Sequence, residues 1–170
     1  MIFHGYFRSS AAWRCRIAFN LKGVQPDETR FVQLRKGGGE QKTETFHVLN
    51  PQGLVPVLET SDGVLTQSLS IIEYLDQTTP GLRLLPEDPF QRAKVRAFAM
   101  AIACDVHPLQ NLRVLSYLAE NFRATQDQRE EWCRYWIAAG LEACEHLVSE
   151  DTWFCFGDHP GLAEVCLIPQ

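Results

Sequence analysis

The sequence predicts an α+β protein of two parts, a mixed strand-and-helix domain followed by an all-helical domain. Three observations support this class. Up to residue 79, short apolar runs alternate with helical patterns. A proline-rich stretch at 80–88 would interrupt any helix or central strand. After it, apolar residues recur at helical spacing. We therefore expect domains at residues 1–79 and 89–170, joined by a linker at 80–88.

The first domain begins with the pattern of a βαβ unit. Residues 2–7 form an apolar run typical of a buried strand. Apolar residues then recur at four-residue spacing over 13–21, and Lys22-Gly23 supplies a basic last turn and a glycine suited to the position after a helix. Residues 28–34 predict the second strand.

The rest of the first domain reads as a hairpin and a helix. Residues 36–39 lack the Lys-Ser/Thr ending of a phosphate loop, so we expect a surface loop that binds no nucleotide. Residues 54–58 and 64–66 predict two strands joined by the turn Ser61–Gly63. A helix follows Ser68.

The second domain carries clear helix-start signals. Asp88, Pro89 and Gln91 combine an N-cap, a proline at the first helical position and a capping-box glutamine. Thr125 and Gln128 form another capping box. The wide apolar stripe that follows, over residues 132–148, predicts a central helix.

Composition narrows the functional class. The 170 residues are 45% hydrophobic, enough for a core. Their net charge of −5 argues against a nucleic-acid partner. The first residues lack a signal-peptide pattern, and no apolar run approaches the roughly 18 residues of a membrane span. We expect a cytoplasmic protein with no membrane partner.

The cysteines and histidines do not suggest a metal or a disulfide framework. The six cysteines form no CxxC pair and lie mostly in apolar helical patterns, which is typical of reduced, buried thiols. Cys104 and His107 share a helix face, but a buried thiol beside a polar residue explains them better than a ligand pair without partners. We predict no metal site and no disulfide.

The junction of the first strand and first helix is suited to holding an anion. A helix start presents free backbone N–H groups and the positive end of the helix dipole. Ser9 or Ser10 can cap the helix or donate a hydroxyl to the anion, and Arg8 and Arg14 bracket them with groups suited to carboxylates. The simpler interpretation is a capped helix with solvated arginines.

Two further segments add peptide-binding features. Pro56 lies inside an apparent strand, which leaves two alternatives. Either the Val55-Pro56 bond is cis, which would turn the backbone of Val55 outward to pair with a peptide, or the proline stands at the start of the strand. Gln67-Ser68 opens a second helix start in the same half-domain.

Together these segments resemble the zeta-class glutathione transferases of the maleylacetoacetate and maleylpyruvate isomerase group. The resemblance spans nearly the whole chain and is specific in combination. The segments that carry it are residues 9–18, Asn50–Gln52 with Val55-Pro56, Gln67-Ser68 with Ile71–Leu75, and Asp105–Arg113.

This resemblance implies a thioredoxin-like N-terminal domain and an all-α C-terminal domain that is incomplete relative to the family. It implies glutathione as coenzyme and a role for each site residue. Ser9 helps to ionise the glutathione thiol, with Ser10 beside it, and Arg8 and Arg14 bind substrate carboxylates. Val55 pairs with the cysteinyl backbone, and Gln67 and Ser68 hold the γ-glutamyl end. Further glutathione contacts come from Gln41, His107, Asn111 and Arg113.

The activity implied by the resemblance is cis–trans isomerisation of a maleyl dicarboxylate in aromatic amino acid catabolism, by a homodimer. Two alternatives stay open: a general glutathione transferase or dehalogenase, and a non-catalytic glutathione-binding domain. The chain departs from the class pattern at Ala11, where the family has cysteine, and at Gly161, where a capping hydroxyl is lost. Neither the choice between the two maleyl substrates nor that between Ser9 and Ser10 is decided by sequence.

Overall fold

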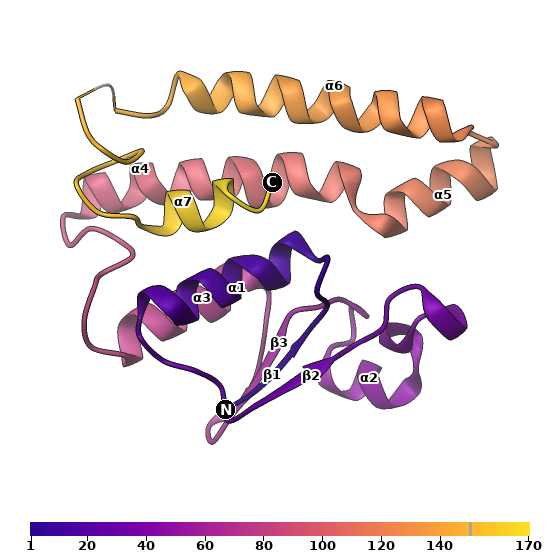
Figure 1. Ribbon diagram of the computed structural model, residues 1–170, viewed down its shortest axis with the longest axis horizontal. Helices are drawn as coiled ribbons and strands as arrows, with labels where there is room; N and C mark the ends of the chain where they lie inside the picture. The colour runs from indigo at the N-terminus through magenta and orange to yellow at the C-terminus, as the bar shows by residue number, and fades with distance from the viewer. Residues whose placement is uncertain (150) are drawn as a thin grey trace. The chain divides into compact units, whose positions relative to one another are not determined.

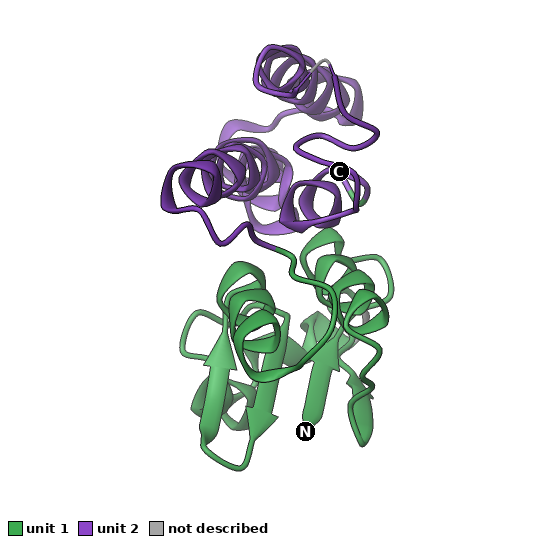
Figure 2. Cartoon of the chain, turned by 90° about the vertical axis from the view of Figure 1, so that its left-hand side faces the viewer, with its two compact units in different colours: residues 1–84, 169 green, residues 85–168, 170 purple. Residues whose placement is uncertain are grey.

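The computed structural model describes residues 1–149 and 151–170, the side chain of residue 36 excepted. The chain divides into two compact units, residues 1–84 with 169 and residues 85–168 with 170 (Figure 2). The division falls inside the stretch 80–88 expected to be a linker.

The first unit is a four-stranded sheet with three α-helices and two short 3-10 helices (Figure 1), and the expected βαβ–ββα order is confirmed. The strand order is β2-β1-β3-β4, with β1 parallel to β2 and the other neighbours antiparallel. The elements are β1 (Ile2–Gly5), α1 (Ser10–Leu21), β2 (Glu28–Phe31), η1 (Lys36–Gly38), η2 (Glu40–Lys42), α2 (Glu44–Leu49), β3 (Val57–Thr60), β4 (Gly63–Thr66) and α3 (Ser68–Thr78). The second strand is shorter than the predicted 28–34.

Successive residues of β1 face opposite sides of the sheet, as strand geometry requires. The ring of Phe3 packs edge-on against Phe19 of α1, with centroids 5.4 Å apart. The ring of His4 lies 6.4 Å from that of Phe46 in α2. Helices α1 and α3 therefore cover one face and α2 the other (Figure 1).

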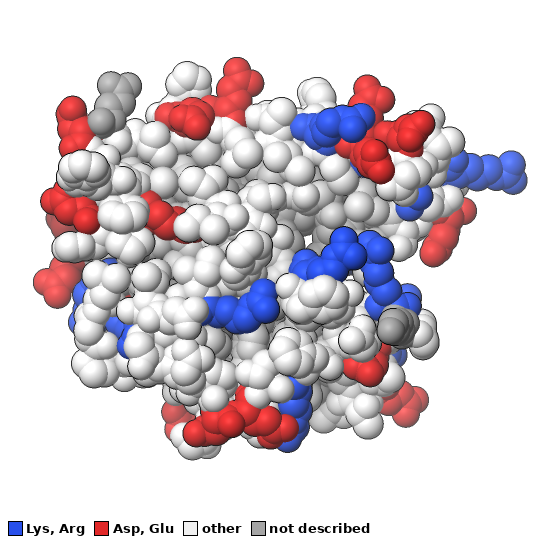
Figure 3. Space-filling model, in the orientation of Figure 1, with Lys and Arg blue, Asp and Glu red and all other residues white. Residues whose placement is uncertain are grey.

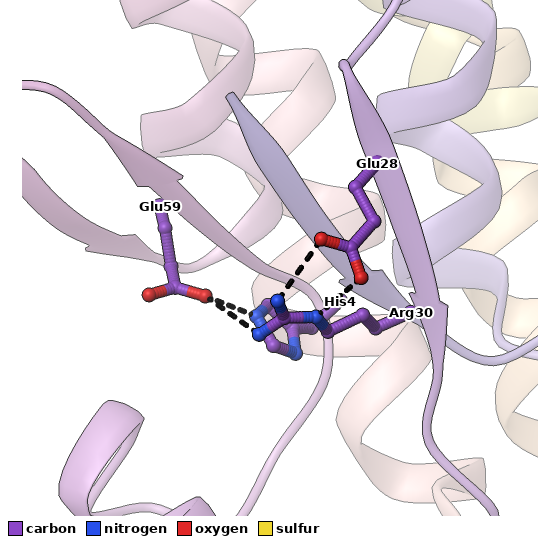
Figure 4. Close-up of polar contacts among 4 residues, drawn as sticks. All are labelled: His4, Glu28, Arg30 and Glu59. Atoms are coloured by element: carbon purple, nitrogen blue, oxygen red, sulfur yellow. Dashed lines mark hydrogen bonds and ion pairs between the residues drawn. The ribbon is translucent and has the colours of Figure 1, made fainter.

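Polar side chains link three strands on the α2 side of this sheet (Figure 4). His4 Nε2 lies 2.6 Å from Glu59 Oε1, and Arg30 Nη1 lies 3.6 Å from the same oxygen. Arg30 also donates two hydrogen bonds to Glu28, at 2.7 and 2.9 Å. The network joins β2, β1 and β3 side by side.

A buried ion pair ties the end of this unit to its helices. Lys22 Nζ lies 3.2 Å from Asp76 Oδ1 and donates to the Leu82 carbonyl at 2.8 Å. The same Asp76 oxygen accepts from the Leu84 N–H at 2.8 Å. The sequence predicted Lys22 as a basic residue of the last turn. Its side chain is fully buried, and its charge is paired with that of Asp76, far along the chain. Gly23, at φ +66°, ends α1 as expected.

The second unit is helical in its regular elements. They are α4 (Pro89–Met100), the π-helical η3 (Ala101–Val106), η4 (His107–Gln110), α5 (Leu112–Phe122), α6 (Gln126–Glu145) and α7 (Leu162–Leu167). The expected caps are present: Asp88 accepts from the Gln91 N–H at 2.9 Å, and Thr125 and Gln128 form a reciprocal capping box. At α7, Glu164 Oε2 accepts from the Gly161 N–H at 2.6 Å, so half of the box survives without the hydroxyl.

The prediction that the long stripe marks a central helix is wrong. Among the residues of α6, Cys144 alone is buried, whereas five of the six residues of α7 are buried. The apolar side chains of the stripe are only partly covered: Trp132 and Trp136, with ring centroids 5.7 Å apart, are half-buried, so α6 lies at the surface of its unit. Gly140 of α6 allows close approach to η3, since a Cβ there would lie 2.1 Å from Val106 Cγ2.

In the part of the chain that the structure describes, no helix combines the length and apolar character needed to cross a membrane. Acidic and basic side chains are both present on the face drawn in Figure 3.

The buried Lys22–Asp76 pair gives a stability prediction. Lys22→Met leaves the Asp76 carboxylate buried without its cation, so we expect the free energy of unfolding to fall by about 3–5 kcal/mol. Chemical denaturation followed by circular dichroism measures this. Arg30→Met removes an exposed partner of Glu28 and is the control, expected to change little. Equal effects of the two substitutions would contradict the assignment.

Candidate functional site

The register of the sheet brings four chain segments to one end of the first unit. His4 pairs with Val57, and Val57 with Thr66, so these residues form one row across β1, β3 and β4. Gly5 of β1 pairs with Phe31 of the parallel strand β2. The chain therefore leaves β1, β2 and β4, and enters β3, at the same end. The candidate residues of this unit lie in those segments or at the helix starts that follow them, except Arg14, which lies one turn into α1.

Ser9 is the N-cap of α1, which settles the local roles of the two serines. It has extended backbone angles, and its Oγ accepts from the Ala12 N–H at 3.2 Å. Ser10 is the first helical residue. Because a hydroxyl both accepts and donates, the cap bond leaves the Ser9 O–H hydrogen available to a ligand. Its position at a helix start favours an anionic one.

The arginines near this helix differ in environment. Arg8 is exposed, whereas Arg14 is only 1% exposed. Arg16 donates to the Phe7 carbonyl at 3.2 Å and so steadies the turn before Ser9. Arg8 is thus open to an incoming carboxylate, while a carboxylate would have to enter a buried environment to meet Arg14.

The segment before β3 is held in a defined shape. The Val55-Pro56 bond is cis, the first of the two alternatives left open by the sequence. Val55 is partly buried and packs against the cluster of Val32, Phe46 and Val57. This segment lies beside the end of β1 because of the His4–Val57 pairing.

The start of α3 has an unusual backbone. Gln67 precedes the helix at φ +67°, a left-handed conformation rare for residues other than glycine. Its Nε2 donates to Gln52 Oε1 at 2.6 Å. Ser68 is buried, and its carbonyl lies 3.9 Å from Cys15 Sγ of α1. This contact joins the second turn of α1 to the start of α3.

Gln41 contributes a buried polar group to the same unit. It is 9% exposed, and its Nε2 donates to the Leu34 carbonyl at 3.2 Å. Among the described atoms, Oε1 has no hydrogen-bond partner. A buried carbonyl oxygen without a donor is costly, and a ligand N–H would reach this atom only after the side chain moves.

The remaining candidates lie in the second unit. His107 begins η4, and Asn111 is the N-cap of α5, where its Oδ1 accepts from the Arg113 N–H at 3.2 Å. The Arg113 side chain is exposed. These three residues are close to one another along the chain, and their contacts to glutathione stay predictions.

The protein's own thiols differ in exposure. All six cysteines are free, but the expectation that they are buried holds only for Cys15, Cys144 and Cys166. Cys104 is exposed, since its stretch of helix faces solvent. Burial, helped by the nearby Glu164 carboxylate, raises the pKa of the Cys155 thiol to about 12, so it is protonated at neutral pH. In the described part of the chain, no three His, Cys, Asp or Glu side chains gather as a metal site would require.

Comparison with known proteins agrees with this arrangement. Residues 8–78 match the family model of the glutathione S-transferase N-terminal domain. The chain is 45% identical to a probable maleylacetoacetate isomerase of Vibrio cholerae, an alignment that covers 100% of the chain and 79% of that protein. The fold, with a helical second unit, is that of a glutathione transferase.

Two solved structures are similar over 99% of the chain, each with a TM-score of 0.90 and 41% identity. One is a holo maleylpyruvate isomerase, described as a bacterial zeta-class glutathione S-transferase, of which 80% is covered. The other is a maleylacetoacetate isomerase of Methylobacterium extorquens with bound malonate and glutathione, of which 79% is covered. The chain belongs to this zeta-class family of maleylacetoacetate and maleylpyruvate isomerases.

Sequence reasoning assigned no role to Gln52 or Asn50, although both lie in the Asn50–Gln52 segment that carries the resemblance. The signal was available in that segment. Gln52 contacts Gln67, 15 positions away, whereas the hydrogen bonds of Asn50 stay within four residues along the chain.

Proposed function

We propose that this protein is a glutathione-dependent cis–trans isomerase of a maleyl dicarboxylate, either maleylacetoacetate or maleylpyruvate, in the catabolism of aromatic amino acids. The observation that supports this most is the cap at Ser9. A hydroxyl with a free hydrogen stands at the start of α1, on the sheet end that Val55 and Gln67 share. The relatives' names and the bound malonate, itself a dicarboxylate, support the substrate class.

The residues of the first unit fit glutathione as a coenzyme. Glutathione supplies a thiolate that adds to the cis double bond and leaves after rotation about the resulting single bond. Ser9 would donate its O–H to the sulfur and, with the helix start, favour the ionised thiol. Val55 would pair with the cysteinyl backbone, and Gln41 has a buried oxygen suited to a donor.

Substrate binding needs positive charge beside the thiolate. The Arg8 guanidinium is exposed next to Ser9 and is suited to a carboxylate or to the charge that develops on an enolate oxygen. Arg14 would be a second carboxylate ligand. Its burial means that Arg14→Ala would also remove packing, so Arg8 gives the cleaner measurement.

We also propose a cytoplasmic homodimer in which the domains are residues 1–79 and 89–170. The family resemblance supports this assembly, and exposed apolar side chains such as Val64 and Phe90 are compatible with an interface. Analytical ultracentrifugation tests it, and a monomer at all concentrations would reject it.

The function is tested by ultraviolet absorbance of both maleyl substrates, with and without glutathione. We expect isomerisation of at least one substrate that stops when glutathione is omitted. Glutathione binding with conjugation of other electrophiles but no isomerisation would instead indicate a general transferase. No binding at all would contradict a glutathione enzyme.

Ser9→Ala should lower kcat by about 10²–10³-fold, the effect of removing one donor that acts in the transition state. Glutathione affinity should change little, because the peptide's other contacts stay. Thr43→Ala is the matched control, since it removes the equivalent cap bond to Phe46 N in α2. A large loss in Ser10→Ala with normal turnover in Ser9→Ala would reverse the assignment.

Arg8→Ala should raise the KM for the dicarboxylate about 10- to 100-fold, as expected for losing a charged hydrogen bond of about 1.5–3 kcal/mol. Calorimetry should show unchanged glutathione binding. Arg30→Ala, an exposed arginine paired with Glu28, is the control. If Arg8→Ala and Arg30→Ala have the same KM, Arg8 does not bind substrate.

A further inference from the structure

We propose that Gln52 is a positioning residue of the glutathione site, which holds the amide of Gln67 in the orientation that receives the γ-glutamyl group. The proposal rests on the proposed function, because it concerns the same coenzyme. It assigns a role to a residue in the loop before β3 that the comparison with the family left without one.

The two glutamine side chains meet directly. Gln67 Nε2 donates to Gln52 Oε1 at 2.6 Å, across 15 positions of sequence. Both residues are exposed, so packing does not force the contact. Gln67 also has the left-handed φ of +67°, which directs its side chain differently from that of a normal helical residue. A strained backbone and a hydrogen-bonded side chain together define where its amide lies.

The loop that carries Gln52 is itself held by a buried side chain. Asn50, 2% exposed, donates from Nδ2 to the Leu54 carbonyl at 2.7 Å. Its Oδ1 accepts from the Gln52 N–H at 3.0 Å. The Pro51 carbonyl lies 3.1 Å from His47 Nδ1 of α2. The backbone of Gln52 is thus fixed from both sides, and its side chain is a firm support for Gln67.

The chemistry of the pair suits the γ-glutamyl end of glutathione, which carries an ammonium and a carboxylate on one carbon. Because Nε2 of Gln67 is held by Gln52, its Oε1 points away and can accept from the ammonium. The N–H groups at the start of α3 supply donors for the carboxylate. Without Gln52, the Gln67 amide would rotate freely and would have to be ordered on binding.

The test compares Gln52→Met, close in size but without an amide acceptor, with Gln25→Met. Gln25 is an exposed glutamine of the same unit whose Nε2 donates to Asn20 Oδ1 at 3.0 Å. The ligands are glutathione and cysteinylglycine, which lacks the γ-glutamyl group. Calorimetry gives Kd, and the isomerase assay gives KM for glutathione and kcat separately.

We expect Gln52→Met to raise Kd and KM for glutathione about tenfold, with kcat at saturating glutathione and Kd for cysteinylglycine unchanged. Gln25→Met should match the wild type. The double variant Gln52→Met/Gln67→Met should bind glutathione as weakly as Gln67→Met alone, because Gln52 acts through Gln67.

Wild-type glutathione affinity in Gln52→Met, an equal loss for both ligands, or additive effects in the double variant would overturn the proposal. The binding measurement does not depend on turnover. If the wild type binds glutathione but isomerises neither maleyl substrate, the proposed function fails while the result for Gln52 still stands.

Discussion

The pairing of His4 with Val57 and of Val57 with Thr66 is the constraint on which the site depends. A shift of one residue in either pairing would turn every side chain of the shifted strand to the opposite face. It would also move the loop before β3, or the start of α3, away from the end of β1. The core residues Phe3, Val57 and Leu58 hold this register. Phe3 and Leu58 are paired and buried on one face of the sheet, and Val57 is buried on the other. Packing of the core and placement of the site are therefore one requirement.

Around that row, polar groups do two tasks at once. The Ser9 hydroxyl satisfies a backbone N–H of α1 and keeps a hydrogen to donate. Gln67 has a left-handed backbone conformation before α3, and Gln52 accepts a hydrogen bond from its side-chain amide. Gln41 keeps one buried oxygen without a partner among the described atoms. Departures from ordinary hydrogen bonding and backbone geometry are thus found in the segments from which the proposed glutathione site is built.

Local signals in the sequence predicted local structure well. Gly23 ends a helix, Thr125 and Gln128 cap one, and the βαβ–ββα order follows from periodicity. The sequence did not predict interactions between distant residues. The burial of Lys22 depends on Asp76, 54 positions away. An apolar stripe does not distinguish a central helix from α6, in which Cys144 alone is buried. Among the site residues, the burial of Arg14 and the support of Gln67 by Gln52 depend in the same way on tertiary structure.

The central claim is that one end of the sheet in the first unit binds glutathione. A titration of the isotopically labelled protein with glutathione, followed by backbone amide NMR, tests it most directly. The account predicts that the largest shifts occur together at residues 8–10, 41, 52–55 and 67–68, with one saturating affinity. The opposite end of the sheet, around Thr60 and Gly63, should stay unchanged. Saturable shifts centred on that opposite end, or no shifts at all, would contradict the account.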